Sequence, residues 1–179
     1  LITHHATKSA AVGALWARKR WNCARIAVID FDVHHGNGTQ EIFQRDPGLF
    51  YASTHQAPFY PGTGAAHETG IDGNVVNVSL QAGAGGEAFR AVMSGRVLPA
   101  LDAFGPDFIL ISAGFDAHMQ DPLANLWLEE ADYDWVTRQI MRIADAHCAG
   151  RVVSALEGGY DLHALASSVQ SHVKALMAG

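Results

Sequence analysis

RIAVIDFDVHHGNG, residues 25–38, joins a short apolar run to a cluster of aspartates and histidines. The run at 25–30 is continuous and does not alternate with polar residues, which is typical of a strand covered on both faces of a sheet. Similar runs lie at residues 49–54, 74–80, 107–112 and 151–156. Together these runs predict five strands of a mostly parallel sheet.

Segments with helical spacing lie between several of the predicted strands. Apolar residues recur every three or four positions over residues 87–104 and 130–147, and a weaker pattern covers residues 9–20. Asp161 suits the N-cap position of a last helix. Strands that alternate with helices predict a single α/β domain over residues 1–179, built around the mostly parallel sheet.

The composition excludes several classes of protein. Hydrophobic residues make up 49% and charged residues 17%, which excludes a disordered chain, and no apolar run is long enough for a membrane helix. A formal charge of −6 argues against nucleic acid as a direct partner. The two cysteines form no CxxC motif, which fits a reducing compartment, so we expect a cytoplasmic protein without a membrane partner.

Polar clusters follow four of the predicted strands at their carboxyl ends. DFDVHHGNG (30–38) follows the first strand, STH (53–55) the second, AGFDAH (113–118) the fourth and EGGYD (157–161) the fifth. Ligands of open α/β sheets bind in the crevice beyond the carboxyl ends of the strands. We therefore expect the four clusters to converge on one site.

The candidate metal ligands are Asp32, His34 and Asp116. Asp32 and His34 are separated by one residue in an extended segment, so both can face the same side. Two carboxylates, one imidazole and an open fourth position describe a hydrolytic mononuclear Zn²⁺ site, whereas non-haem iron more often takes two histidines and one carboxylate. The alternative is that the aspartates cap loops and His34 lies at the surface.

Two further motifs suit the hydrolysis of an amide. The doublet His4–His5 can supply a general base and a general acid, or it can be a frayed terminal stretch. Tyr160 can donate a hydrogen bond to an oxyanion, and the preceding Gly158 and Gly159 let the backbone approach a substrate closely. An ordinary Gly-Gly-Tyr turn is the alternative for the second motif.

The aromatic loop PFYPGTG, residues 58–64, can wall an apolar channel or form a surface turn with buried rings. The remaining histidines are not predicted to be ligands. We expect a supporting or solvated role for His55, His67 and His118, and a structural or surface role for His147, His163 and His172.

In order along the chain, DFDVHHGNGTQ, STHQAPFYPGTG, ISAGFDAH followed by DPLA, and LEGGYD resemble the motifs of the zinc-dependent histone deacetylase family. The resemblance is strongest to class II-like bacterial members and to the related acetylpolyamine amidohydrolases, and it runs from about residue 10 to the C-terminus. It implies an arginase-like three-layer α/β fold that is incomplete at its N-terminus. It also implies hydrolysis of an acetyl-lysine, an acetylpolyamine or a similar amide.

The resemblance also implies roles for single residues. Asp32, His34 and Asp116 correspond to the zinc ligands of the family, and Tyr160 to its carbonyl-polarising tyrosine. An arginase-type dimanganese site is disfavoured, because the sequences DVHHGN and FDAH lack the additional aspartates of such a site.

Other roles are implied by the same motifs. His4 and His5 resemble the catalytic histidine doublet of the family, with Asp30 orienting His4 and Asn37 as the partner of His5. The segment that usually holds a structural K⁺ corresponds to Asp30, Asp32, His34, Ser53 and Thr54. The substrate channel corresponds to Phe59, Tyr60, Gly158 and Gly159.

The sequence departs from the family pattern near His4. Only three residues precede this histidine, and the Gly-Phe-Cys stretch that usually follows the doublet is absent. We therefore expect weak or no activity on a standard acetyl-lysine substrate, and association either with a second copy or with an absent N-terminal part. The alternative function is a catalytically impaired metal-binding or assembly module.

Overall fold

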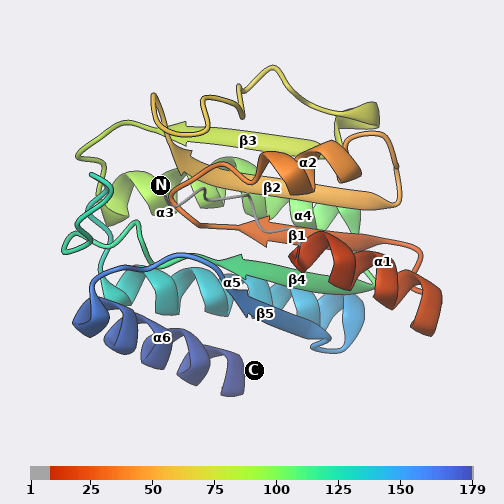
Figure 1. The fold of residues 1–179 in the computed structure, drawn as a ribbon. Helices are drawn as coiled ribbons and strands as arrows, with labels where there is room; N and C mark the ends of the chain where they lie inside the picture. The colour runs from red at the N-terminus through yellow and green to blue at the C-terminus, as the bar shows by residue number, and fades with distance from the viewer. Residues whose placement is uncertain (1–8, 179) are drawn as a thin grey trace.

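The computed structural model describes residues 9–178, which form a parallel five-stranded sheet covered by helices (Figure 1). The strand order is β3-β2-β1-β4-β5, and every neighbouring pair is parallel. The strands are β1 (Ile26–Asp30), β2 (Leu49–Gln56), β3 (Val75–Leu80), β4 (Phe108–Ala113) and β5 (Val152–Leu156). All five predicted strands are present, and the predicted α/β class is confirmed.

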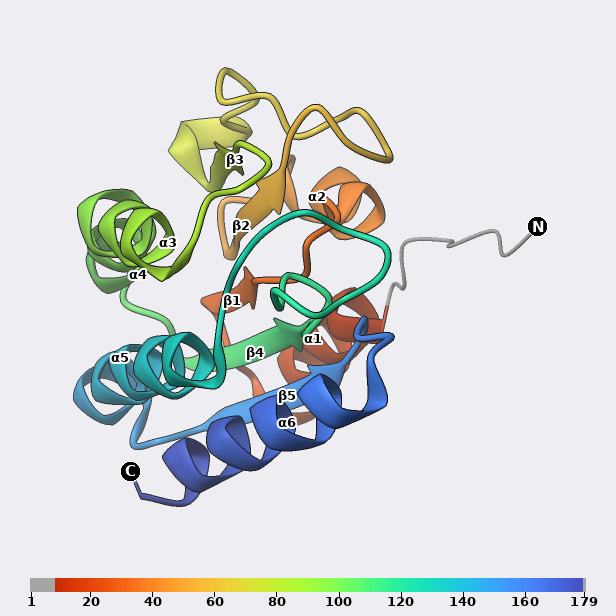
Figure 2. The same ribbon diagram turned by 90° about the vertical axis from the view of Figure 1, so that its left-hand side faces the viewer.

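Helices cover both faces of the sheet, which gives three layers (Figure 2). One face carries α1 (Ser9–Trp21) and α2 (Asn37–Phe43). The other face carries α3 (Gly86–Val92), α4 (Leu98–Phe104), α5 (Glu130–Cys148) and α6 (Leu162–Met177). Within residues 9–178, no helix combines the length and the apolar character that crossing a bilayer requires.

Two details of the helices differ from the sequence expectation. The pattern over residues 87–104 predicts one helix, but a π-helical turn at Met93–Val97 separates α3 from α4 there. The short helix α2 was not predicted, because seven residues are too few for a clear apolar period and Gly36 gives it no side-chain cap. A short 3₁₀ turn at Ile71–Gly73 precedes β3.

The continuous apolar runs are explained by two separate cores. In β1, Ile26 and Val28 pack with α1 and α2 on one face, while Ala27 and Ile29 pack with α3 to α6 on the other. Because successive side chains point to opposite faces, a strand between two cores cannot alternate with polar residues. The strand β5 is the exception, since this edge strand leaves Leu156 61% exposed.

His172 on α6 belongs to the buried interior and is held as a neutral ring. The Thr137 hydroxyl donates to the Tyr133 carbonyl oxygen, so it accepts a hydrogen bond from His172 Nδ1 at 2.6 Å. Nε2 is left to accept from the Ser154 hydroxyl at 2.8 Å. Burial lowers the pKa of His172 to about 4, because the charged ring would lose its hydration.

The stability of the fold is therefore expected to fall in mild acid. The unfolded chain binds the His172 proton near pH 6.5 and the folded chain near pH 4, so the stabilising contribution is complete above pH 6.5 and is lost as the pH falls toward 4. The slope from this one group approaches about 1.4 kcal/mol per pH unit. Urea unfolding of wild type and His172→Phe at pH 7.5 and pH 5.0 measures how much stability this histidine removes in acid. Equal losses of stability in both proteins would contradict the assignment.

Candidate metal centre and active site

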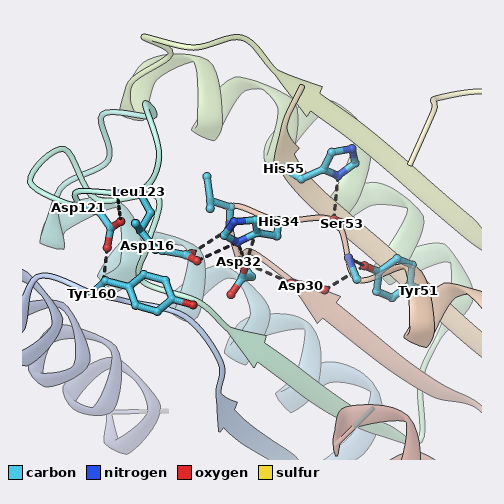
Figure 3. A network of polar contacts seen from close by, with 12 residues as sticks. Asp30, Asp32, His34, Tyr51, Ser53, His55, Asp116, Asp121, Leu123 and Tyr160 are labelled. Atoms are coloured by element: carbon cyan, nitrogen blue, oxygen red, sulfur yellow. Dashed lines mark hydrogen bonds and ion pairs between the residues drawn. The ribbon is translucent and has the colours of Figure 1, made fainter. Parts of the chain in front are cut away.

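The candidate site lies at the carboxyl edge of the sheet, where the loops after β1 and β4 meet (Figure 3). Asp32 and His34 follow β1, and Asp116 follows β4. The two strands are neighbours in register, with Asp30 opposite Ser112. This pairing brings together side chains that are more than eighty residues apart in sequence.

Three side chains converge at this point. His34 Nδ1 lies 3.0 Å from Asp32 Oδ1 and 3.1 Å from Asp116 Oδ2. One ligand atom from each of the three residues lies within 4.8 Å of the others, as a metal site requires. The Asp116 side chain is fully buried, while Asp32 and His34 keep partial access to solvent. The cluster therefore has one open side.

The electrostatics of the cluster show an excess of negative charge. Burial and then the charge of Asp32 raise the pKa of Asp116 to about 6, and burial raises the pKa of Glu157 to about 7. For His34 burial acts in the opposite direction, but its hydrogen bonds to Asp116 and Asp32 outweigh that effect and raise its pKa to about 10. A site that favours a positive charge this strongly suits a bound cation.

Backbone amides fix both carboxylates. The amide of Val33 donates to Asp116 Oδ1 at 3.0 Å, which leaves Oδ2 for the cluster. The amide of His34 donates to Asp32 Oδ1 at 2.8 Å. The amide of Asp32 donates to Asp30 Oδ1 at 3.1 Å, so the buried Asp30 stabilises the loop beneath the three clustered side chains.

Gly158 leaves the space that a metal ion would need. A Cβ atom at this position would overlap Asp116 Oδ2 and lie 2.7 Å from Asp32 Oδ2. Any larger residue would therefore displace both carboxylates. The two carboxylates, the imidazole and this cradle together fit a Zn²⁺ ion with an open position for substrate.

Gly158→Ala is expected to weaken zinc binding at least about tenfold, because overpacking costs on the order of 1–3 kcal/mol and here acts on the two carboxylates. Calorimetric titration of the metal-free chain with zinc measures the affinity. Gly95→Ala is the matched control, since a Cβ atom there meets no other atom within 4 Å. Equal affinity in the two variants would show that Gly158 is an ordinary turn residue.

Tyr160 lies beside the cluster and points its hydroxyl toward it (Figure 3). Burial, followed by the negative charges of Asp116 and Asp32, raises the pKa of the phenol to about 12. The hydroxyl therefore keeps its proton at neutral pH and can donate a hydrogen bond. The residue is 37% exposed, so it lies on the open side of the site.

The aromatic loop lies over the same side. The ring of Phe59 stacks on His34 with 5.2 Å between centroids, and Tyr60 meets His34 edge-on at 6.3 Å. His35 Nδ1 lies 2.8 Å from the Thr63 hydroxyl, which ties the far end of the loop to the residue after His34. The loop therefore forms an aromatic wall beside the open side of the cluster.

Comparison with known proteins decides the family of this site. The sequence matches the histone deacetylase domain over residues 4–176. The chain belongs to the histone deacetylase family. It is 45% identical over 170 residues to Histone deacetylase 14, chloroplastic, of Arabidopsis thaliana. The aligned region covers 93% of this chain and 40% of that protein. It is 41% identical over 172 residues to a probable deacetylase of Archaeoglobus fulgidus, with coverage of 94% and 48%.

Solved structures of the family share the fold. The HDA15 HD domain superposes with a TM-score of 0.86 at 39% identity, covering 94% of this chain and 48% of that one. The histone deacetylase Clr3 gives a TM-score of 0.89 at 32% identity, covering 98% and 31%. The arginase/deacetylase-like fold is thereby confirmed. The chain spans about half or less of the length of these relatives.

The other predicted residues of this deacetylase-family chain are placed as follows. His4 and His5 lie outside the described residues, so the structure does not locate the doublet. Asn37 is exposed at the start of α2. Of the residues predicted for K⁺, Asp30 and Ser53 are buried opposite each other on β1 and β2, while the side chain of Thr54 points to the other face of the sheet.

A contact beneath the site was not predicted from the sequence. The Tyr51 hydroxyl donates to Asp30 Oδ2 at 2.9 Å and accepts from the amide of Gly36 at 3.0 Å. Tyr51 therefore anchors the carboxylate that supports the Asp32 loop. The available signal was a tyrosine inside a fully buried strand, because its hydroxyl needs a polar partner there.

Proposed function

We propose that this chain carries the active site of a zinc-dependent deacetylase that hydrolyses the amide of an acetylated amine, such as acetyl-lysine or an acetylpolyamine. The observation that carries the proposal is the convergence of Asp32, His34 and Asp116 at the carboxyl edge of the sheet, with Tyr160 beside them. Membership of the histone deacetylase family supports the type of reaction.

Asp32, His34 and Asp116 would hold the metal. When bound, Zn²⁺ polarises the amide carbonyl and lowers the pKa of its water. The amides of Val33 and His34 hold the two carboxylates in place before a cation binds. His34 must lose its Nδ1 proton to act as a ligand, so metal binding releases a proton.

Tyr160 would stabilise the transition state. Water attack places negative charge on the former carbonyl oxygen, and a phenol whose pKa is about 12 remains protonated and donates to it. Phe59 and Tyr60 would line the channel for the acetylated side chain, and the backbone of Gly158 and Gly159 would lie beside it.

His4 and His5 would supply the base that takes a proton from water and the acid that protonates the leaving amine. In this proposal Asp30 orients His4, and Asn37 is the partner of His5. A structural K⁺ would be held by the segment of Asp30, Asp32, His34, Ser53 and Thr54. The buried free cysteines Cys23 and Cys148 support the proposed cytoplasmic location.

Acetate release tests the proposal. The zinc-loaded chain is incubated with an acetyl-lysine peptide or with an acetylated polyamine, and a metal-free sample is the control. Release from either substrate that depends on zinc supports the function, and the faster substrate identifies its class. The second candidate is a catalytically impaired metal-binding module, which the same cluster of Asp32, His34 and Asp116 supports. Zinc binding without acetate release would support that candidate instead.

We also propose that another polypeptide covers α1 and β5, either a second copy or an N-terminal part. Both elements expose apolar side chains: Val12 is 63% exposed, Trp16 58% and Leu156 61%. Exposed apolar patches and strand edges favour pairing with another chain. Light scattering after size-exclusion chromatography is expected to show a dimer or a larger species, and Trp16→Glu is expected to shift it toward the monomer. A wild-type monomer that stays soluble at high concentration would contradict the proposal.

A further inference from the structure

The side chain of Asp121 contacts the loop that carries Tyr160. Asp121 lies in the segment between β4 and α5 and is buried. Its Oδ2 accepts the backbone N–H of Tyr160 at 2.8 Å, and its Oδ1 accepts the backbone N–H of Leu123 at 2.9 Å (Figure 3). A single carboxylate therefore joins two loops that are 39 residues apart in sequence.

Asp121 is itself held in place by its own loop. Its amide donates to the His118 carbonyl oxygen at 2.9 Å. The amide of Met119 donates to the Leu128 carbonyl oxygen at 3.0 Å, and His118 forms a β-bridge with Leu128. This loop begins near Asp116. It therefore connects the candidate metal site to the carboxylate of Asp121, which contacts Tyr160.

The Tyr160 backbone lies in a loop between strand β5 and helix α6. It follows Gly158 and Gly159, and Gly159 adopts a φ of +135°, a region that other residues rarely enter. Helix α6 begins only at Leu162. Tyr160 as a residue is 37% exposed. The hydrogen bond from the amide of Tyr160 to Asp121 fixes the backbone from which the tyrosine side chain extends.

We propose that Asp121 is a positioning residue, which holds the backbone of Tyr160 so that its hydroxyl meets the substrate carbonyl; this inference rests on the proposed function. A carboxylate suits the task because it offers two acceptors and no donor to two backbone N–H groups. Hydrogen bonds to an ionised acceptor are also stronger than neutral ones. Asparagine has a similar shape but can accept only through one oxygen.

Amide exchange tests the contact without any need for turnover. The chain has four tyrosines, so labelling with ¹⁵N-tyrosine gives four backbone amide signals, and Tyr160→Phe identifies the one from Tyr160. Asp121→Ala is expected to raise the exchange rate of that amide about tenfold or more. The amides of Tyr51 and Tyr133 should keep their rates, because they lie in β2 and α5.

Asp107→Ala is the matched control. Asp107 Oδ2 also accepts two backbone N–H groups, from Ala24 at 2.9 Å and Arg25 at 2.8 Å, but it does so at the amino edge of the sheet. This variant loses a comparable pair of hydrogen bonds and should leave the Tyr160 amide unchanged. If Asp121→Ala does not fold, the isosteric Asp121→Asn replaces it in every experiment.

The kinetic test is a double-mutant cycle on acetate release. Asp121→Ala is expected to lower kcat about tenfold to a hundredfold with KM changed less than about twofold, because a shift of the hydroxyl affects mainly the transition state. In the Tyr160→Phe background, Asp121→Ala should lower kcat less than about threefold, because the hydroxyl that Asp121 would position is already absent. If Asp121 had only a structural role, its substitution would lower kcat by the same factor in both backgrounds.

Each outcome decides between the alternatives. An unchanged exchange rate of the Tyr160 amide in Asp121→Ala overturns the inference, and so does an equal kinetic loss in the two backgrounds. If the wild-type chain releases no acetate, the proposed function fails, and amide exchange alone decides whether Asp121 holds Tyr160.

Discussion

Tyr160→Phe is expected to slow acetate release on the order of 10²–10³-fold, the usual loss when one oxyanion donor is removed. The substitution deletes one hydroxyl and leaves the ring, so the loop and the three metal ligands keep their places. The loss should appear in kcat with little change in KM, because the hydrogen bond strengthens only as the carbonyl oxygen becomes charged. Zinc content is expected to equal that of the wild type.

Tyr133→Phe is the matched control for that experiment. The Tyr133 ring is buried beside Phe115, and within residues 9–178 its hydroxyl has no hydrogen-bond partner. Removing this hydroxyl should leave turnover nearly unchanged. Near-normal kcat in Tyr160→Phe, or an equal loss in both variants, would contradict the role of Tyr160.

Asp32→Ala and His34→Ala are each expected to abolish zinc binding at stoichiometric concentrations and to reduce hydrolysis to background. Each variant removes one of three protein ligands, and in His34→Ala the two carboxylates also lose the group that holds them together. Elemental analysis of the purified variants after exposure to zinc gives the occupancy, and circular dichroism checks the fold.

The control variant for the ligands is Asp134→Ala. Asp134 is an aspartate of α5 whose carboxylate pairs with Arg138 at 2.9 Å at the surface. Its loss should leave zinc content and turnover unchanged, because surface ion pairs contribute little. Full zinc occupancy in both Asp32→Ala and His34→Ala would exclude this site as the metal centre.

The sheet and the edge that carries the site could be predicted from local pattern. Continuous apolar runs such as residues 26–29 occur where a strand is covered on both faces, and polar residues that follow such runs must meet at one edge. Helix α2 and the π-helical turn at Met93–Val97 could not be predicted in this way. Helix α2 is too short to show a helical period of apolar residues. The π-helical turn keeps the apolar stripe of a helix and changes only its backbone hydrogen bonds.

The cluster of candidate metal ligands could be predicted because its chemistry is visible in the side chains. Asp32, His34 and Asp116 have types and spacings that suit a cation, and the structure places them together. The contacts of Asp121 and Tyr51 could not be predicted, because their partners are the Tyr160 amide and a carboxylate on a neighbouring strand. A backbone N–H group leaves no trace in the sequence, so such contacts emerge only once the fold is known.

The most direct test of the metal centre is anomalous diffraction at the zinc absorption edge, recorded from crystals of the full chain grown with one equivalent of zinc. One strong peak is expected within bonding distance of Asp32, His34 and Asp116, on the side that Tyr160 faces. A zinc peak bound by other side chains, with these three residues still in contact through the His34 ring, would contradict this expectation.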